Sequence, residues 1–196
     1  MRALRTAMVA ALAALTLVAL TASAASTLSM GPRGLQNLVS AQLFTKKGRW
    51  YLIDDGVCFT YLQSPRTHLD AGRLVLDARL TSRLGQRVGD TCLGADFASN
   101  VTLSGKLRAT DRKLLLDDIR IDRVDDEATR NALQLALQLA PQALPHSVDI
   151  DVLETLRRQI ADGSGLPVRV EQFHILTLST RPDGISIQLD VGLSTP

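Results

Sequence analysis

Alternation of apolar and polar residues in two segments, 73–81 and 101–108, constrains the fold of this chain more than any other feature. Successive side chains of a β-strand point to opposite faces, so the pattern indicates strands with one buried and one solvated face. The apolar positions are Leu74, Leu76, Ala78, Leu80, Val101, Leu103 and Leu107. Such two-faced strands are typical of antiparallel sheets. We therefore expect an antiparallel sheet whose interior receives these side chains.

Turn-like segments divide much of the remaining chain into further strands. These segments are 54–56, 70–72, 110–113 and 181–184. The first interrupts a run that favours strand, the second precedes the alternating segment 73–81, and the last two are expected to be hairpin turns. Within the strand that follows the third turn, the apolar positions change parity, from Leu114 and Leu116 to Ile119 and Ile121. A slip of one residue would expose half of the apolar face unless the strand bulges. The sequence therefore predicts a β-bulge at Asp117 or Asp118.

Two segments have helical periodicity. Residues 32–44 begin with a proline directly after Gly31. Helical spacing places Leu35, Leu38, Val39 and Leu43 on one face, which predicts a short amphipathic helix.

Residues 126–140 are rich in Ala, Leu and Gln and end before a proline. Their apolar arc is wide, because it contains Leu133, Leu135, Leu137 and Leu139. We expect this second helix to be covered on more than one side, by a strongly curved sheet, a partner or an apolar ligand. Residues 148–161 favour an extended stretch followed by a helix.

The N-terminal segment 1–24 has the organisation of a secretory signal peptide. Arg2 and Arg5 precede an uncharged apolar run, which ends at the small residues 22–24. We expect cleavage near Ala24, which leaves residues 25–196 as a single soluble domain in the periplasm or outside the cell; an uncleaved membrane anchor is the alternative. No cysteine precedes Cys58, so the lipoprotein route is closed and no stable membrane anchor is expected after cleavage.

Cys58 and Cys92 are the only cysteines of the chain. In an oxidising compartment a lone pair is more often a disulfide than two free thiols. We therefore predict a disulfide between Cys58 and Cys92. A redox-active pair is the alternative, but the spacing differs from Cys-x-x-Cys.

Composition argues against several functions. The chain has 22 Lys and Arg residues and 20 Asp and Glu residues, and loss of Arg2 and Arg5 would make the numbers equal. Neither the basic surplus of a nucleic-acid binder nor a polybasic membrane-binding cluster is present, so no nucleic-acid partner is expected. His68, His146 and His174 are isolated in the sequence, and segment 163–165 does not form a Gly-x-Ser-x-Gly motif. We expect no metal, no cofactor and no enzymatic activity.

A cluster of acidic residues between 117 and 127 lacks the spacing of a calcium-binding loop. Its members are Asp117, Asp118, Asp122, Asp125, Asp126 and Glu127. We interpret them as the solvated face of a strand followed by acids at a helix N-terminus.

The order of the expected elements resembles that of the YceB-like envelope proteins. The segments that carry the resemblance are 34–38, 64–66, 80–85, 115–121 and 133–144. The resemblance implies the tubular lipid-binding (TULIP) fold, in which a strongly curved antiparallel sheet wraps a long helix and leaves an apolar lumen. This chain departs from that family in lacking its lipoprotein cysteine and in carrying Cys58 and Cys92.

These features together predict an α+β fold in which a strongly curved antiparallel sheet wraps a long apolar helix, with short flanking helices. The resemblance and the wide apolar arc favour a carrier of a lipid or another apolar small molecule, bound between helix and sheet. The candidate cavity residues are Leu74, Leu76, Leu80, Leu103, Leu107, Leu133 and Leu137. A ligand-free interaction protein of the cell envelope is the alternative.

Overall fold

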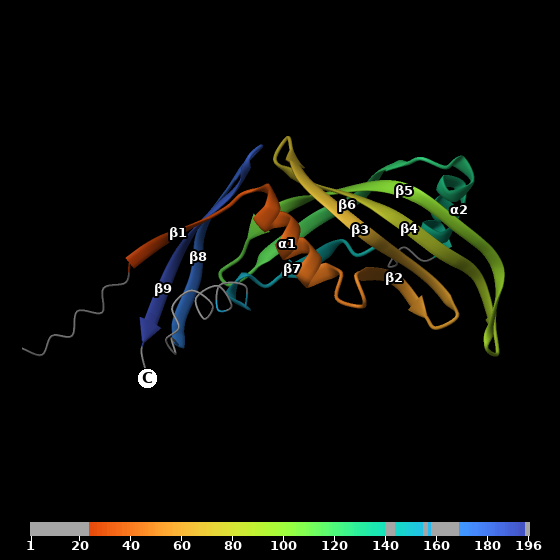
Figure 1. Cartoon of the computed structure of the whole chain (residues 1–196), viewed down its shortest axis with the longest axis horizontal. Helices are drawn as coiled ribbons and strands as arrows, with labels where there is room; N and C mark the ends of the chain where they lie inside the picture. The colour runs from red at the N-terminus through yellow and green to blue at the C-terminus, as the bar shows by residue number, and fades with distance from the viewer. Residues whose placement is uncertain (1–23, 140–143, 155–156, 158–168, 195–196) are drawn as a thin grey trace, which may run out of the picture.

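The computed structural model describes residues 24–139, 144–154, 157 and 169–194, most of which lie in β-strands. Two antiparallel sheets are present, one six-stranded and one three-stranded (Figure 1). The six-stranded sheet consists, in spatial order, of β2 (Arg49–Asp55), β3 (Cys58–Asp70), β4 (Arg73–Val88), β5 (Thr91–Ala109), β6 (Leu114–Val124) and β7 (Ser147–Ile150). The three-stranded sheet consists of β1 (Ala24–Met30), β9 (Gly184–Ser194) and β8 (Arg169–Arg181). The two named helices are α1 (Pro32–Leu43) and α2 (Glu127–Leu139).

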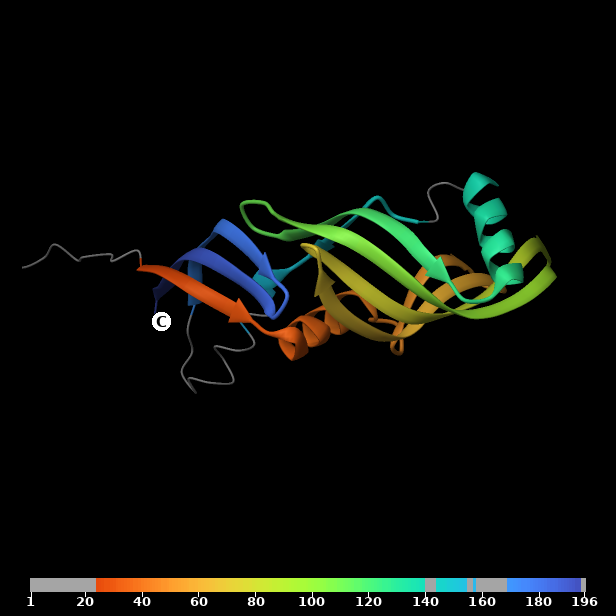
Figure 2. The same ribbon diagram turned by 90° about the horizontal axis from the view of Figure 1, so that it is seen from above.

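All four turn-like segments lie between neighbouring antiparallel strands, which confirms the predicted hairpins at 110–113 and 181–184. In the turn between β5 and β6, the Thr110 backbone N–H donates a 2.8 Å hydrogen bond to the Lys113 carbonyl. Along the chain, strands β2 to β7 also follow one another across the sheet. Because successive strands twist in one hand, this meander curls into an open half-barrel (Figure 2).

The β-bulge predicted in β6 is confirmed. Ser104 pairs with Arg120 and Lys106 pairs with Asp117, so two residues of β6 lie opposite the single Gly105. The first of the two, Asp118, has a φ of 51°. Because of the extra residue, the apolar side chains before and after the bulge point to the same face of the sheet. Both Leu116 and the apolar residues after the bulge therefore face the interior.

The core lies on the inner face of the curled sheet. The alternating leucines of β4 and β5 are buried there together with the apolar face of α1, which consists of Leu35, Leu38, Val39 and Leu43. Gln36 attaches α1 to β3: its Nε2 donates to the Pro65 carbonyl at 2.9 Å, and its Oε1 accepts from the Thr67 N–H at 2.7 Å. The predicted helix at 32–44 and the predicted alternation are therefore confirmed.

The predicted α+β fold, with the sheet wrapped around a long apolar helix, is wrong. The protein is mostly β, and α2 is a 13-residue amphipathic helix at the end of the six-stranded sheet far from the three-stranded sheet (Figure 2). The side chain of Leu133 is buried in the core, whereas Leu135 is 57% exposed. The physical reason is that α1 and the inward side chains of the sheet fill the hollow, so α2 packs along one side only.

The three-stranded sheet contains a strand that the sequence reasoning missed. β1 pairs antiparallel with β9, from Ala24 opposite Val191 to Met30 opposite Ile185. The apolar side chains of β8 and β9, among them Phe173 and Ile187, belong to the same hydrophobic cluster as the core of the larger sheet. The predicted signal peptide lies outside the described residues except for Ala24. The predicted helix within 148–161 is described only in part, with Val152 in a helical turn after β7.

The predicted disulfide between Cys58 and Cys92 is present, with the two Cα atoms 5.2 Å apart. Strand β4 lies between β3 and β5, so in a flat sheet these cysteines would be separated by about two strand spacings, roughly 10 Å. The β4–β5 ribbon must therefore coil near its tip. Gly85 and Gly94 face each other there, and a Cβ atom on either residue would collide with the backbone of the opposite strand.

Candidate functional site

An apolar groove of about 480 Å³ lies between β6 and α2. Its apolar lining consists of Ile119, Ile121, Val124, Leu133, Leu137 and Leu144. Its polar lining consists of Arg120, Asp122, Arg123, Arg130 and Gln134. We call this feature the β6–α2 groove.

The groove exists because β6 is paired along only part of its outer edge. β7 covers β6 from Leu114 to Asp117, and among the described residues no strand pairs with the outer edge of β6 beyond that point. The bulge at Asp118 lies where this pairing ends. The groove therefore has the free edge of β6 as one wall.

The second wall, α2, is oriented by the capping of its N-terminus. The Asp126 Oδ2 accepts hydrogen bonds from the backbone N–H and the hydroxyl of Thr129, both at 2.7 Å. Both bonds lower the pKa of the Asp126 carboxyl, and the bond from the Thr129 hydroxyl has the larger effect. The Asp126 N–H in turn donates to the Ser99 hydroxyl on β5 at 3.0 Å. The start of α2 is thus attached directly to the sheet.

The face of α2 that borders the groove follows helical spacing. Arg130, Leu133, Gln134 and Leu137 are separated by three, one and three residues, so they share one side of the helix. Behind them a narrow apolar crevice continues toward the hollow of the sheet. Leu133 and Leu137 line both spaces, and the crevice is further lined by Leu52, Ile53, Thr60, Ile121, Ala136 and Leu144.

The charged residues of the groove differ in their partners. Arg120 pairs with Asp122 and Arg123 pairs with Asp125, each at 2.8 Å. Arg130 instead donates a 2.7 Å hydrogen bond from Nη2 to the carbonyl of Val124, the last residue of β6. The positive charge of Arg130 is therefore held in place by a neutral group.

Two of the seven predicted cavity residues, Leu133 and Leu137, line the groove. The other five are 1% to 8% exposed and lie in the core of the half-barrel: Leu74, Leu76, Leu80, Leu103 and Leu107. The sequence reasoning did not assign Ile119, Ile121 or Arg130 to the cavity. The change from even to odd apolar positions within β6 could have pointed to this wall of the groove, because it marks where the strand leaves its regular pairing.

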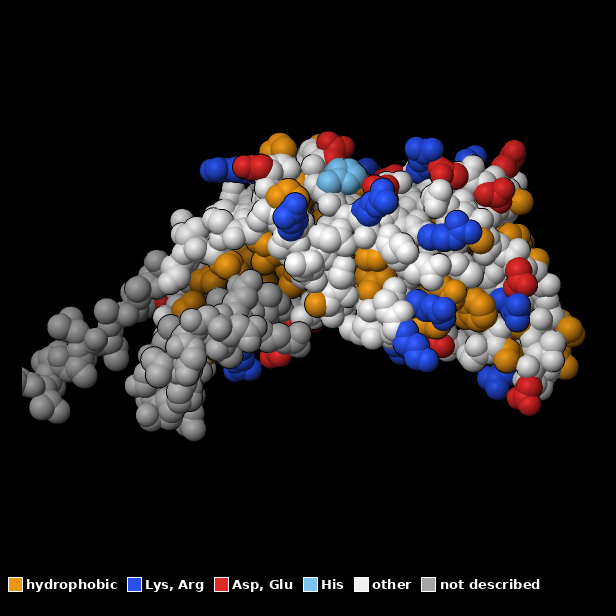
Figure 3. Space-filling model, viewed as in Figure 1, with side chains coloured by type: hydrophobic (Ala, Val, Ile, Leu, Met, Phe, Trp, Pro, Cys, Tyr) orange, Lys and Arg blue, Asp and Glu red, His pale blue; other side chains and the backbone are white. Residues whose placement is uncertain are grey.

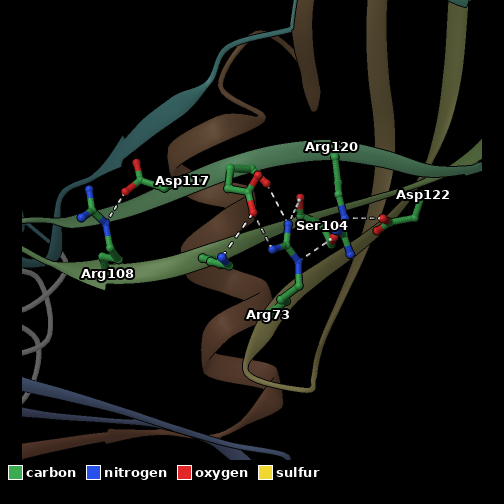
Figure 4. A network of polar contacts seen from close by, with 8 residues as sticks. Arg73, Ser104, Arg108, Asp117, Arg120 and Asp122 are labelled. Atoms are coloured by element: carbon green, nitrogen blue, oxygen red, sulfur yellow. Dashed lines mark hydrogen bonds and ion pairs between the residues drawn. The ribbon is translucent and has the colours of Figure 1, made fainter.

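The outer face of the sheet carries a polar network that includes much of the acidic cluster (Figure 4). The Arg73 guanidinium donates from Nη1 to the Asp118 Oδ2 at 2.9 Å, from Nη2 to the Asp118 carbonyl at 2.7 Å, and from Nε to the Ser104 hydroxyl at 3.0 Å. Asp117 pairs with Arg108. Each of the four aspartates from Asp117 to Asp125 is thus bound by an arginine, which supports their interpretation as a solvated strand face. Basic and acidic side chains are interspersed on the visible surface (Figure 3).

The histidines are separate from the groove. His174 Nδ1 lies 2.6 Å from Asp111 Oδ1, and this contact joins β8 to the turn between β5 and β6. His68 lies 3.7 Å from Asp77 on the outer face, and His146 is exposed. Within the described residues, no three His, Cys, Asp or Glu side chains gather as a metal site would require. None of the described helices has the length and apolarity needed to span a membrane.

Compared with known proteins, the chain matches no family model, no curated protein and no solved structure. The resemblance to the YceB-like proteins therefore depends on the sequence patterns alone.

Proposed function

We propose that this protein binds an apolar ligand, such as the acyl chain of a lipid, in the β6–α2 groove. The observation that carries the proposal is the groove itself: about 480 Å³ of space with six apolar side chains around it. This volume is within the usual range of small-molecule sites, and transfer of each CH₂ group from water contributes about 0.8 kcal/mol. Such binding requires no catalytic residue, and we propose no enzymatic activity.

We further propose that the protein acts in the periplasm or outside the cell. The disulfide between Cys58 and Cys92 supports an oxidising compartment. The signal-peptide pattern of residues 1–24 and the resemblance to YceB-like envelope proteins favour the same location.

Substitution of Leu137 by Trp tests the proposed function. Leu137 is half-buried in the groove wall, so an indole at this position fills space that the ligand would occupy. We expect the dissociation constant for a fluorescent fatty acid to rise roughly tenfold, the equivalent of about 1.4 kcal/mol, with a small change in the thermal unfolding midpoint. Titration of probe fluorescence measures the affinity.

Leu135→Trp is the matched control, because Leu135 lies on the same helix, is 57% exposed and does not line the groove. It should leave probe affinity unchanged. Equal affinities in the two variants, or no binding of an acyl probe by the unmodified protein, would contradict the proposed function.

A second candidate function is that of an interaction protein, and the tip of the β4–β5 ribbon favours it. Val88 and Leu93 expose 53% and 60% of their surface there. Apolar side chains at the end of a ribbon can dock into a partner. Absence of acyl binding by the unmodified protein would make this candidate the better one.

A further inference from the structure

The β6–α2 groove has a cation at the same end as the start of α2. Arg120 and Arg123 each form an ion pair with a neighbouring aspartate, whereas the Arg130 side chain donates to the Val124 carbonyl and to no other group of the described residues. Asp126 is near enough for Arg130 to contribute to lowering its pKa, but the Asp126 Oδ2 accepts its hydrogen bonds from Thr129. Arg130 is therefore the one arginine lining the groove that forms no ion pair with any described residue.

The hydrogen bond to the Val124 carbonyl holds the Arg130 side chain in place and uses only part of its donors. A guanidinium has five N–H donors in a planar fork, and the structure uses one nitrogen, Nη2, for the Val124 carbonyl. No described residue accepts a hydrogen bond from the remaining donors, and a planar fork matches the two oxygens of a carboxylate or phosphate. Because the side chain is already fixed, less conformational entropy is lost on binding.

The apolar part of the groove begins directly beside this cation. Leu133 and Leu137 follow Arg130 by three and seven residues on the same face of α2, which places Leu137 about 10 Å along the helix axis from Arg130. A ligand that lies along α2 therefore meets a positive charge at one end and aliphatic side chains along the rest. This order matches a molecule with a charged head and an apolar tail.

We propose that the ligand of the groove is an anionic amphiphile and that Arg130 binds its carboxylate or phosphate head. The tail lies against Leu133, Leu137 and the apolar residues of β6. This inference rests on the proposed function, because it specifies the ligand of the same groove. It differs from that function in requiring a negative charge on the ligand.

The test compares three amphiphiles of equal chain length: dodecanoic acid, dodecyl phosphate and uncharged dodecanol, each below its aggregation concentration. Titration calorimetry with the unmodified protein and with Arg130→Gln gives the affinities. A charge-assisted hydrogen bond changes affinity by roughly tenfold or more, so Arg130→Gln should weaken binding of the acid and the phosphate by about that factor. Dodecanol binding should change less than about twofold, because it carries no charge.

Arg112→Gln is the matched control, since it removes the same charge from the exposed turn between β5 and β6, outside the groove. It should leave all three affinities unchanged. Arg130→Lys, which retains the positive charge, should bind the acid more tightly than Arg130→Gln does. Inorganic phosphate, which has no tail, should not bind measurably; saturable binding of it with the affinity of dodecyl phosphate would overturn the amphiphile assignment.

The outcomes separate this inference from the proposed function. If all three amphiphiles bind and Arg130→Gln affects them equally or not at all, the role of Arg130 is refuted while the groove remains a ligand site. If none of them binds the unmodified protein, both proposals are overturned.

Discussion

At the scale of single residues, Arg73 donates four hydrogen bonds on the outer face, to Ser104 and Asp118. Its side chain is only 13% exposed, and it contacts both the carboxylate and the carbonyl of Asp118, the bulged residue of β6. A left-handed backbone conformation is unfavourable for a residue other than glycine. Arg73 offsets that cost by satisfying the polar groups of Asp118. Since the bulge lies where the groove begins, one arginine on the outer face stabilises the strand whose free edge forms a wall of the groove.

Replacement of Arg73 by Met should lower the thermal unfolding midpoint at pH 7 by about 3 to 8 °C, because Asp118 and Ser104 lose the hydrogen bonds that the largely buried Arg73 side chain donates. It should also change the dependence of stability on pH. The Arg73 guanidinium lowers the pKa of Asp118 below its ordinary 3.8, so the ionised carboxylate contributes stability above that pH and the contribution is lost as pH falls further. Urea unfolding between pH 3 and 7 should show a smaller loss at low pH in the variant.

Arg83→Met is the control for this prediction. Arg83 pairs with Asp96 in a bidentate geometry, but both side chains are largely exposed, and such pairs contribute little. The thermal unfolding midpoint should therefore fall less in Arg83→Met than in Arg73→Met. A larger shift for Arg83→Met than for Arg73→Met would show that the bulge does not depend on Arg73.

At the scale of elements, the β4–β5 ribbon is decisive for the shape of the sheet. It continues well beyond the alternating core segments, to Val88 and Thr91, and its end carries few buried side chains. Gly85 and Gly94 allow the two backbones to approach closely where the ribbon coils. The disulfide then attaches the coiled end to the start of β3. Local sequence thus determines the coil and a covalent bond retains it.

Gly85→Ala should destabilise the protein by about 1 to 3 kcal/mol, because the added methyl group would collide with the Leu93 carbonyl and force the strands apart. Chemical denaturation followed by circular dichroism measures the change. Gln86→Ala, at an exposed neighbouring position, should change stability by less than about 0.5 kcal/mol. Similar values for the two variants would show that the close approach of the strands is unimportant.

At the scale of the whole molecule, contacts between distant segments hold the two sheets and α1 together. The Ile175 N–H on β8 donates to the Asp111 carbonyl at 2.7 Å, and His174 contacts the Asp111 side chain. The hydrophobic cluster passes from β4 and β5 through α1 to β9 without interruption. These contacts join residues far apart in sequence, so folding must bring distant parts of the chain together. The disulfide between Cys58 and Cys92 restricts the unfolded chain and should therefore raise the free energy of unfolding.

The unfolded, unreduced protein should contain no titratable thiol, because Cys58 and Cys92 are bonded. The double variant Cys58→Ser, Cys92→Ser should lose about 3 to 4 kcal/mol of unfolding free energy, as expected from the entropy of a loop closed by a sequence separation of 34. Two reactive thiols per chain, or no loss of stability in the double variant, would refute this role for the bond.

Much of the strand architecture could be predicted from local patterns. The turns at 54–56, 70–72, 110–113 and 181–184, helix α1 and the bulge near Asp118 depend on neighbouring residues, and their signals are present in short windows. β1 could not be identified in this way, because it gains its hydrogen bonds from β9, which follows more than 150 residues later. For the candidate site, the prediction identified Leu133 and Leu137 on the helix but not the opposite wall on β6.

The sequence by itself determined the alternating strands and their turns, which faces are apolar and which cysteines can pair, since period, turn chemistry and composition are local properties. Only the tertiary structure decided which helix occupies the hollow and where the apolar groove lies. The curvature of the sheet, the four-residue pairing of β7 with β6 and the docking of α1 are contacts between distant residues. They leave α2 outside the half-barrel with Leu135 in solvent. A wide apolar arc on a helix therefore shows that the helix needs a contact, while the packing of the rest of the chain decides which side of the helix obtains one.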